Sequence, residues 1–309
     1  MSKKKVSSET PPSPIYIFRG HAEQINSLEF IENNGYLISG DAGGNIIIWD
    51  MISKRSKVQF KAHNDGILNV VKCKDKLISH GRDNTLHVWE FNQLSNIKDG
   101  GNKEESIKPE ISLTVNSINF CKFDFCYEGR IYWYCMAIKI FPNNTFQNLQ
   151  SFIKNYFILA AYESGSVILW SIIINTNELM SNEKNNVAIE KLWNQKEHGE
   201  SDLSSDKQFA ISTSGDNKIV KYNFDEVPLI KSTTIKYAGI AEVKIRSDGK
   251  IFATAGWDMK IRIFSSKSMK PLAILSYHRE SVYALAFSHI KHYLVGGGKD
   301  QRISLWKIY

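Results

Sequence analysis

The stretch IFATAGWDMKIRIF at residues 251–264 contains two apolar, strand-like runs on either side of Trp257 and Asp258. Another Trp-Asp pair closes the run GNIIIWD, at Trp49 and Asp50. Short apolar runs bounded by Gly, Asn and Asp are typical of antiparallel strands. The first pair lies in a turn between two strands, whereas the second ends a strand. The two tryptophans therefore have different structural roles, and the spacing of the whole chain shows which one belongs to a repeat.

Strand-like runs that end in an aromatic residue recur along the chain. Their last residues are Trp49, Trp89, Trp170, Tyr222, Phe264 and Trp306. The intervals between them are 40, 81, 52, 42 and 42 residues. An interval of 81 residues corresponds to two periods of about 40, a repeat length typical of β-propellers. We therefore expect one further, poorly marked unit between Trp89 and Trp170, and seven units in all.

Three kinds of polar residue recur at similar positions relative to these aromatic residues. Aspartate stands six residues before the aromatic at Asp83, Asp216, Asp258 and Asp300. Serine or threonine stands ten residues before it at Ser39, Ser79, Ser212 and Thr254. Histidine stands near the start of four units, at His21, His63, His198 and His278. This pattern, with four short strands per unit, resembles the WD40 repeat, so we expect an all-β, seven-bladed WD40 β-propeller over residues 14–309.

In the WD40 pattern these residues form a buried relay of hydrogen bonds. The aspartate accepts from the histidine, the histidine contacts the hydroxyl, and the hydroxyl contacts the indole N–H. The resemblance implies this structural role for His63, Ser79, Asp83, Trp89, His198, Ser212, Asp216, Tyr222, Thr254, Asp258, Asp300 and Trp306. In the first unit Gly43 takes the aspartate position, with Asp41 nearby, and the unit of Asp258 has no histidine.

A hydrolase triad is the alternative interpretation of His63, Ser79 and Asp83. A triad needs one exposed nucleophile beside a base and an oxyanion hole. Here the set recurs along the chain, which favours the structural interpretation, so we expect no catalytic residues and no enzyme activity. The run GGGKD at 296–300 lacks the spacing of a phosphate loop. We also expect no cofactor and no metal, because the four cysteines show no metal-ligand spacing.

The two ends of the chain are expected to meet in one blade. The last unit stops after its third strand, and the run SPIYIFRGH supplies a β-prone segment at residues 14–19. Pairing of that segment with the last blade closes the ring and removes an exposed sheet edge. Residues 1–13, which are basic and contain prolines, are expected to form a disordered tail.

Two units fit the repeat poorly. The third unit, at about residues 115–157, has no obvious closing aromatic, and the fifth has little apolar sequence for an inner strand. Polar stretches at 92–110 and 175–186 are expected to be solvated surface insertions.

Charge and hydropathy limit the classes of partner. The formal net charge is +7, but Lys3, Lys4 and Lys5 supply three of these charges and the other basic residues are dispersed. We therefore expect no direct binding to nucleic acid. No apolar run approaches the ~20 residues of a membrane span, and no secretory signal precedes the first strand. The expected location is inside the cell.

Several runs resemble the ASTRA-associated protein 1 family, whose animal relatives are described as guanine-nucleotide-binding protein β-subunit-like. They include ILAAYESGSVILW at 158–170, GIAEVKIRSDGKIFATAGWDMKIRIF at 239–264 and GGGKDQRISLW at 296–306. The resemblance implies a non-enzymatic WD-repeat scaffold subunit of an ASTRA-type complex. That complex is linked to chromatin remodelling and to the stability and maturation of phosphatidylinositol-3-kinase-related kinases.

The implied partners are Tel–Tti cochaperone-type proteins, RuvB-like ATPases and a kinase-related ASTRA scaffold. The implied location is the nucleus, with the cytoplasm as a second site, and the protein is not expected to be an obligate homo-oligomer. A generic adaptor for chromatin or histone peptides is the alternative. Such an adaptor needs a negatively lined mouth for basic tails, and the positive net charge argues against it.

The residues just before the turn aspartates are candidate partner contacts. They are Arg82, Trp257 and Lys299, with Glu163 at the equivalent place in the fourth unit. Interfaces draw their binding energy from a few aromatic and Arg side chains, which favours Trp257 and Arg82. The alternative for Trp257 is that it only packs over its own blade.

Overall fold

In the computed structural model of the chain, the described regular structure consists of antiparallel strands and one short helix. The structure describes residues 12–31, 34–95, 107–115, 137–142, 153–161, 166–175, 187–196, 202–205, 209–223, 230–290 and 292–308. Within these residues, the strands form six sheets of four strands each. No helix in this part of the chain is long and apolar enough to cross a membrane.

Five of the six sheets consist of strands that are consecutive in the chain. The first holds β2 (Ile25–Ile31), β3 (Tyr36–Asp41), β4 (Asn45–Asp50) and β5 (Arg55–Lys61). The second holds β6 (Ile67–Cys73), β7 (Lys76–Gly81), β8 (Thr85–Glu90) and β9 (Ile111–Thr114), with the short helix α1 (Phe91–Ser95) after β8. The third holds β10 (Ala137–Pro142), β11 (Ile153–Ala161), β12 (Ser166–Asn175) and β13 (Val187–Lys196).

The fourth and fifth sheets follow the same pattern, whereas the sixth includes the N-terminal strand. The fourth holds β14 (Asp202–Ser205), β15 (Phe209–Thr213), β16 (Lys218–Asn223) and β17 (Ile230–Thr234). The fifth holds β18 (Ile240–Ile245), β19 (Ile251–Gly256), β20 (Lys260–Ser265) and β21 (Pro271–Ser276). The sixth holds β22 (Val282–Phe287), β23 (Tyr293–Gly298), β24 (Arg302–Lys307) and, beside β24, the N-terminal strand β1 (Tyr16–Arg19).

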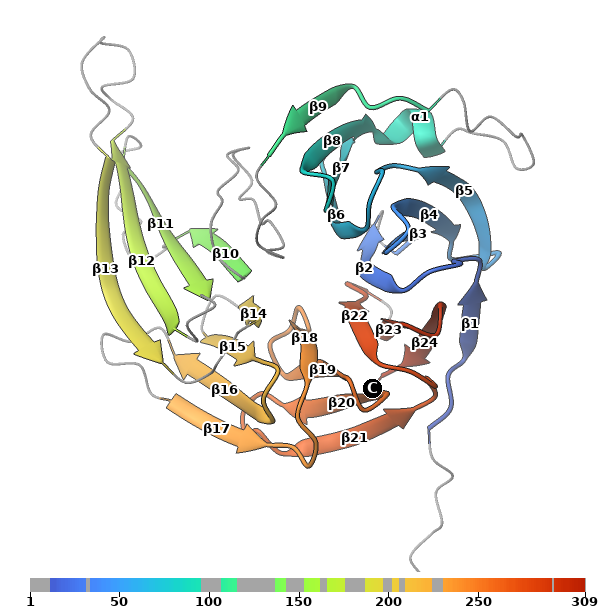
Figure 1. Cartoon of the computed structure of the whole chain (residues 1–309). Coiled ribbons are helices and arrows are strands. Elements are labelled where there is room, and N and C mark those ends of the chain that lie inside the picture. The colour runs from blue at the N-terminus through green and yellow to red at the C-terminus, as the bar shows by residue number, and fades with distance from the viewer. Residues whose placement is uncertain are drawn as a thin grey trace, which may run out of the picture.

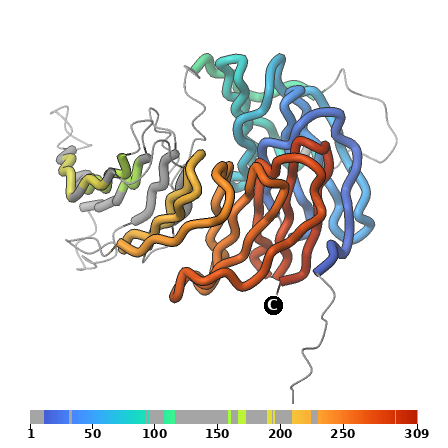
Figure 2. The backbone as a smooth tube through the Cα atoms, turned by 60° about the horizontal axis from the view of Figure 1, so that its bottom comes forward, coloured from blue at the N-terminus to red at the C-terminus, as the bar shows by residue number. Residues whose placement is uncertain are grey.

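The six sheets are blades arranged around a central axis (Figure 1). The first strands of the sheets face this axis, and neighbouring sheets contact each other through them, from β6 to β2, β22, β18, β14 and β10. Figure 2 shows the same arrangement from another side, with the N-terminal β1 next to the C-terminal strands. The architecture is an all-β propeller.

Burial explains why the strands differ in their apolar pattern. On β4, Ile46, Ile47 and Ile48 are all fully buried, because neighbouring sheets cover both faces of this strand. On β5, at the outer edge, Val58 and Phe60 are buried and the residues between and around them are more exposed. The change from continuous to alternating apolar residues therefore marks the step from the inside of a blade to its rim.

The expectation of seven blades was wrong, since the residues that the structure describes form six. The error lies in the interval of 81 residues between Trp89 and Trp170. After β8, the chain passes through α1 and a long connection before β9 completes the second sheet. The next described strand, β10, already belongs to the sheet that contains Trp170. The remaining residues, 115–136, are fewer than the ~40 that a blade needs.

The expected surface insertions are only partly described. Residues 92–95, expected at the start of a solvated insertion, lie in α1, where Leu94 is buried with Phe91 in the core of the first two sheets. Residues 96–106 and 176–186 lie outside the described part of the chain, as do residues 1–11 of the expected tail.

Strand β1 occupies the place expected for it at the edge of the last blade. It pairs antiparallel with β24, with Tyr16 opposite Leu305 and Arg19 opposite Arg302. Phe18 is buried, and its ring lies 5.3 Å from that of Trp49 in the first sheet. The N-terminal strand therefore completes one blade and packs against the next.

Hydrogen bonds also join neighbouring blades at the repeat spacing. Glu29 accepts the backbone N–H of Lys72 with one carboxylate oxygen, across 43 residues. Glu242 accepts the N–H of Leu285 in the same way, again across 43 residues. The first bond is partly buried and the second is buried, and each satisfies polar groups where one inner strand meets the next.

Candidate interaction face and the network beneath it

The second blade contains a complete relay of hydrogen bonds. The ring of His63 lies 3.0 Å from Asp83 through Nδ1 and 2.8 Å from the hydroxyl of Ser79 through Nε2. The indole N–H of Trp89 donates to the same hydroxyl at 2.9 Å. The relay joins the entry loop, the turn and two strands of one blade.

Electrostatics sets the direction of this relay. Burial lowers the pKa of His63, and the charge of Asp83 opposes this effect only in part. Burial works against ionisation of Asp83, yet hydrogen bonds from the Thr85 hydroxyl and the Asn64 N–H lower its pKa. A neutral ring beside a carboxylate donates from Nδ1, so Nε2 of His63 accepts from Ser79.

The same geometry argues against a hydrolase triad. Ser79 is fully buried, and its hydroxyl already contacts both His63 and Trp89. A nucleophile needs an open approach for the substrate carbonyl, which this hydroxyl lacks. Among the described residues, no three His, Cys, Asp or Glu side chains are grouped so that they could hold a metal ion. The arrangement supports the fold.

The first blade forms its relay with the acid in a different position. His21 contacts Asp41 at 2.8 Å and Ser39 at 2.6 Å, and Trp49 donates to Ser39 at 2.8 Å. Burial opposes ionisation of Asp41, but hydrogen bonds from His21 and the Asn45 N–H lower its pKa. The carboxylate thus comes from two residues before the expected position.

Acid and glycine exchange places between the first two blades. The first has Asp41 and Gly43, and the second has Gly81 and Asp83. A Cβ on Gly81 would lie 2.4 Å from Nδ1 of His63, so the glycine leaves room for Asp83 to reach back. Both orders deliver one carboxylate to the blade's histidine.

The last blade takes its hydroxyl from an unexpected strand. His278 contacts Asp300 at 3.0 Å and Ser304 at 2.8 Å, and Trp306 donates to Ser304 at 2.8 Å. The expected hydroxyl position, ten residues before Trp306, holds Gly296, which pairs directly opposite Ser304. Cross-strand pairing was the signal that could have found Ser304, since a side chain on either strand reaches the same place.

In the fifth blade an arginine replaces the histidine. Arg262 donates to both carboxylate oxygens of Asp258, at 2.9 and 2.5 Å, and both side chains are largely buried. Burial works against ionisation of Asp258, and the hydrogen bond from Arg262 lowers its pKa. Arg262 lies opposite the buried Thr254 on the neighbouring strand. Sequence reasoning missed this donor because it looked for histidine in the entry loop.

The fourth blade is described only in part. The hydroxyls of Ser212 and Tyr222 are 3.0 Å apart and buried, and Asp216 accepts the N–H of Lys218 at 2.8 Å. His198, predicted to join them, and Glu163, a predicted contact, lie outside the described residues.

The predicted contacts Arg82, Trp257 and Lys299 occupy equivalent turns. Their N–H groups donate to the carbonyls of Gly66, Gly239 and Ser281, each in the loop before the inner strand of the same blade. All three side chains are exposed on this turn face, Trp257 by 50%. The hydroxyl of Ser281 also donates to the carbonyl of Trp257, which brings the turns of Trp257 and Lys299 together. Arg82 lies two blades beyond Lys299.

Trp257 is one of three exposed apolar residues on two neighbouring loops of the fifth blade. Its ring rests on Gly239, where a Cβ would be 2.4 Å from Cε3, and extends to within 3.6 Å of a Cβ placed on Gly215 of the fourth blade. Tyr237, in the loop that contains Gly239, is 51% exposed, and Met259, in the turn that contains Trp257, is 42% exposed. We call Tyr237, Trp257 and Met259 the Trp257 patch. Trp257 therefore packs on its own blade and still presents half its surface.

Comparison with known proteins identifies the repeat. Residues 12–50, 233–265 and 269–307 match the WD domain, G-beta repeat. These three segments of the chain are similar to that repeat. The solved β-propeller domain of Myceliophteria thermophila Cps50 (Swd1) superimposes with a TM-score of 0.67 at 12% identity, over 97% of this chain and 100% of that domain. The designed protein Ika8 gives 0.63 at 15% identity, over 96% of this chain and 100% of its own.

Curated relatives match this chain over nearly its whole length. ASTRA-associated protein 1 of Schizosaccharomyces pombe is 29% identical over 96% of this chain and 99% of its own. The Aspergillus flavus protein of the same name is 26% identical over 97% and 98%. Mouse guanine nucleotide-binding protein subunit beta-like protein 1 is 29% identical over 97% of each chain. The resemblance to the ASTRA-associated protein 1 family is confirmed.

Proposed function

We propose that this protein is a non-enzymatic scaffold subunit of an ASTRA-type assembly, and that the Trp257 patch binds one of its protein partners. The expected partners are Tel–Tti cochaperone-type proteins, RuvB-like ATPases and a kinase-related scaffold. The names of the relatives support the assembly, and the exposed indole on a fixed backbone supports the binding surface. The role in kinase stability and maturation, and the nuclear and cytoplasmic location, belong to the same proposal.

The half-exposed indole of Trp257 is the observation that carries the binding surface. Large apolar groups exposed together usually mark a contact with another molecule. Trp257 is held by its N–H bond to Gly239 and by the packing of its ring on that residue, so binding would order few new groups. A tryptophan in such a setting can contribute about 2–4 kcal/mol as an interface hot spot.

Affinity purification with mass spectrometry tests both parts of the proposal. The baits are the wild-type chain, Trp257→Ala, and Leu272→Ala as a control, since Leu272 is 59% exposed on the outer strand of the same blade. We expect wild type and the control to recover the partners, and Trp257→Ala to lose at least one with an unchanged melting temperature. Absence of all these partners from the wild-type sample refutes the assembly, and full recovery by Trp257→Ala refutes the patch.

A further inference from the structure

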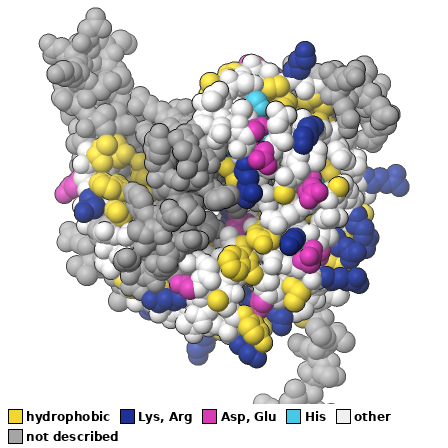
Figure 3. Space-filling model, in the orientation of Figure 1, with side chains coloured by type: hydrophobic (Ala, Val, Ile, Leu, Met, Phe, Trp, Pro, Cys, Tyr) yellow, Lys and Arg dark blue, Asp and Glu magenta, His cyan; other side chains and the backbone are white. Residues whose placement is uncertain are grey.

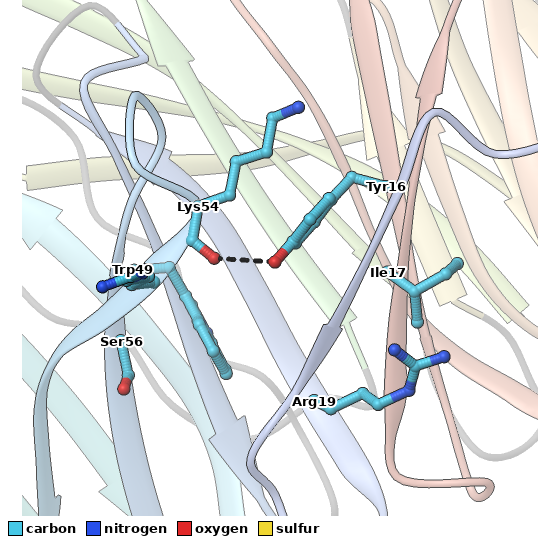
Figure 4. A pocket seen from close by; sticks show the side chains of 7 residues that line it. Tyr16, Ile17, Arg19, Trp49, Lys54 and Ser56 are labelled. Atoms are coloured by element: carbon cyan, nitrogen blue, oxygen red, sulfur yellow. Dashed lines mark hydrogen bonds between the residues drawn. The ribbon is translucent and has the colours of Figure 1, made fainter.

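A pocket of about 410 Å³ opens on the outer rim, at the seam between the last blade and the first. Strand β1 contributes Tyr16, Ile17 and Arg19, and the first blade contributes Trp49, Lys54 and Arg55. Figure 4 shows Tyr16 and Lys54 facing each other, with Trp49 and Ser56 on the side of Lys54 and Arg19 further along β1. The closing strand therefore creates this pocket together with the turn between β4 and β5.

The pocket is lined by cations and by no carboxylate. Arg19, Lys54 and Arg55 line it, and none of them forms an ion pair within the described residues. Asp50 pairs opposite Arg55 on the strands, but its carboxylate accepts the N–H groups of Ile52 and Ser53 inside the turn. Figure 3 shows Lys and Arg side chains gathered along the rim where β1 and β5 lie. The seam is therefore a basic surface.

Lys54 is held in place before any ligand arrives. Its φ of 58° lies in the left-handed region, and its N–H donates to the carbonyl of Asp50 at 2.8 Å. The hydroxyl of Tyr16 donates to the carbonyl of Lys54 at 3.2 Å, and Nζ of Lys54 lies 5.0 Å from the centre of the Tyr16 ring. A cation restrained in this way loses less conformational entropy when it binds an anion.

The turn of Lys54 has an equivalent in the fifth blade, where a different kind of residue occupies the position of Lys54. Met269 has the same φ of 58°, and its N–H donates to the carbonyl four residues earlier, as that of Lys54 does. Met269, however, is buried in the core of its blade. The same turn thus carries a core residue in one blade and a cation facing a pocket in the other.

We propose that this seam pocket binds an acidic segment of a protein partner, with a carboxylate between Lys54 and Arg55. Tyr16, Ile17 and Trp49 provide apolar walls, which suit a peptide side chain better than a run of phosphates. Ile52 projects from the same turn with 86% of its surface exposed and would contact an apolar residue of the segment. Extended nucleic acid would need a longer row of cations than the three here.

Fluorescence anisotropy with a short labelled peptide of Glu, Asp and one Leu tests this site. Its counterpart with Gln and Asn in place of the acids is the ligand control. The protein variant is Lys54→Gln with Arg55→Gln, and the matched control is Lys267→Gln with Lys270→Gln, since these two exposed lysines occupy the equivalent turn of the fifth blade. Melting temperatures verify that both variants fold.

We expect the acidic peptide to bind wild type and the control variant alike, and to bind the Lys54 and Arg55 variant about tenfold more weakly. Binding should also weaken as salt screens the charges. Trp257→Ala should bind the peptide normally, because the pocket is separate from the Trp257 patch, so the two proposals fail independently. No binding of the acidic peptide to wild type, or equal binding of its neutral counterpart, overturns the proposal. The proposal is also overturned if a labelled RNA oligonucleotide or phosphatidylserine vesicles bind at these residues more tightly than the acidic peptide.

Discussion

The indole ring of Trp257 rests on the Cα atom of Gly239, in the loop that leads into the inner strand of its blade. Gly239 has a φ of 95°, and a Cβ there would lie 2.4 Å from the ring. Both the backbone conformation and the close approach require glycine. The contact holds a half-exposed aromatic in one position on the turn face.

Replacing Gly239 by alanine should displace this ring. We expect Gly239→Ala to lower the free energy of unfolding by about 1–3 kcal/mol and to weaken partner binding as Trp257→Ala does. Urea unfolding and tryptophan fluorescence measure the two effects. Gly249→Ala is the control, because Gly249 also has a positive φ, of 67°, and lies in a turn away from Trp257. Equal stability losses and unchanged binding in the two variants would show that the ring contact is unimportant.

Loss of the closing strand should disrupt the propeller. Phe18 is buried against Trp49, and β1 covers the edge of β24. We expect Phe18→Ala to cost about 3–5 kcal/mol and deletion of residues 1–20 to yield aggregated protein. Size-exclusion chromatography and urea unfolding check these outcomes, with deletion of residues 1–11 as the control. A soluble, cooperatively unfolding chain without residues 1–20 contradicts the closure.

Ser304 should matter for stability although it lies outside the repeat spacing. Ser304→Ala removes the partner of both the His278 ring and the Trp306 indole N–H, which are buried. We expect a loss of about 1–3 kcal/mol in the free energy of unfolding. Ser276→Ala, at an exposed position on β21, should change it by less than about 0.5 kcal/mol. A loss no greater than that of the control would rule out the network.

The Asp258–Arg262 pair should behave as a coupled unit. Removal of either partner leaves a buried charge, so Asp258→Asn and Arg262→Met should each cost about 3–5 kcal/mol. The double variant should lose clearly less than the two single losses added together. Urea unfolding of the four proteins gives the coupling energy. Additive losses would mean that the two groups stabilise the blade separately.

Mild acid should destabilise the second blade through His80. Burial lowers the pKa of this ring to about 4, below the ~6.5 of the unfolded chain. The unfolded chain therefore binds a proton first, so stability is complete above about pH 6.5 and falls as the pH drops toward 4. Between pH 7.5 and pH 5, we expect the free energy of unfolding of His80→Gln to fall by about 2 kcal/mol less than that of wild type. Urea unfolding at the two pH values measures these losses. An equal loss of stability in wild type and His80→Gln would show that other groups cause the effect.

Regular spacing made part of the site predictable. His63, Ser79, Asp83 and Trp89 stand at the distances of the repeat, and the structure brings them into one hydrogen-bonded network. The segment at residues 14–19 was predictable as the closing strand because the last unit lacked a fourth strand. Both inferences rest on a local pattern in the sequence, because each blade repeats the same spacing of residues.

Positions that depend on contacts between strands were not predictable in the same way. Asp41 contacts His21 from a position two residues before the expected one. Ser304 contacts His278 from the strand opposite Gly296, which holds the expected position. Arg262 supplies from a strand the hydrogen-bond donor that a histidine supplies in other blades. Spacing cannot distinguish these solutions because several backbone positions bring a side chain to the same point in space.

The sequence by itself determined the all-β repeat, the closing aromatics and the exposed turn position of Trp257, because these follow from hydrophobic period and turn chemistry. The tertiary structure alone decided that the described residues form six blades, since the described strands between Trp89 and Trp170 belong to only two sheets. It alone also placed Tyr16 against Lys54, 38 residues away, to form the basic seam. Such a contact depends on how the two ends of the ring meet, and no local pattern records it.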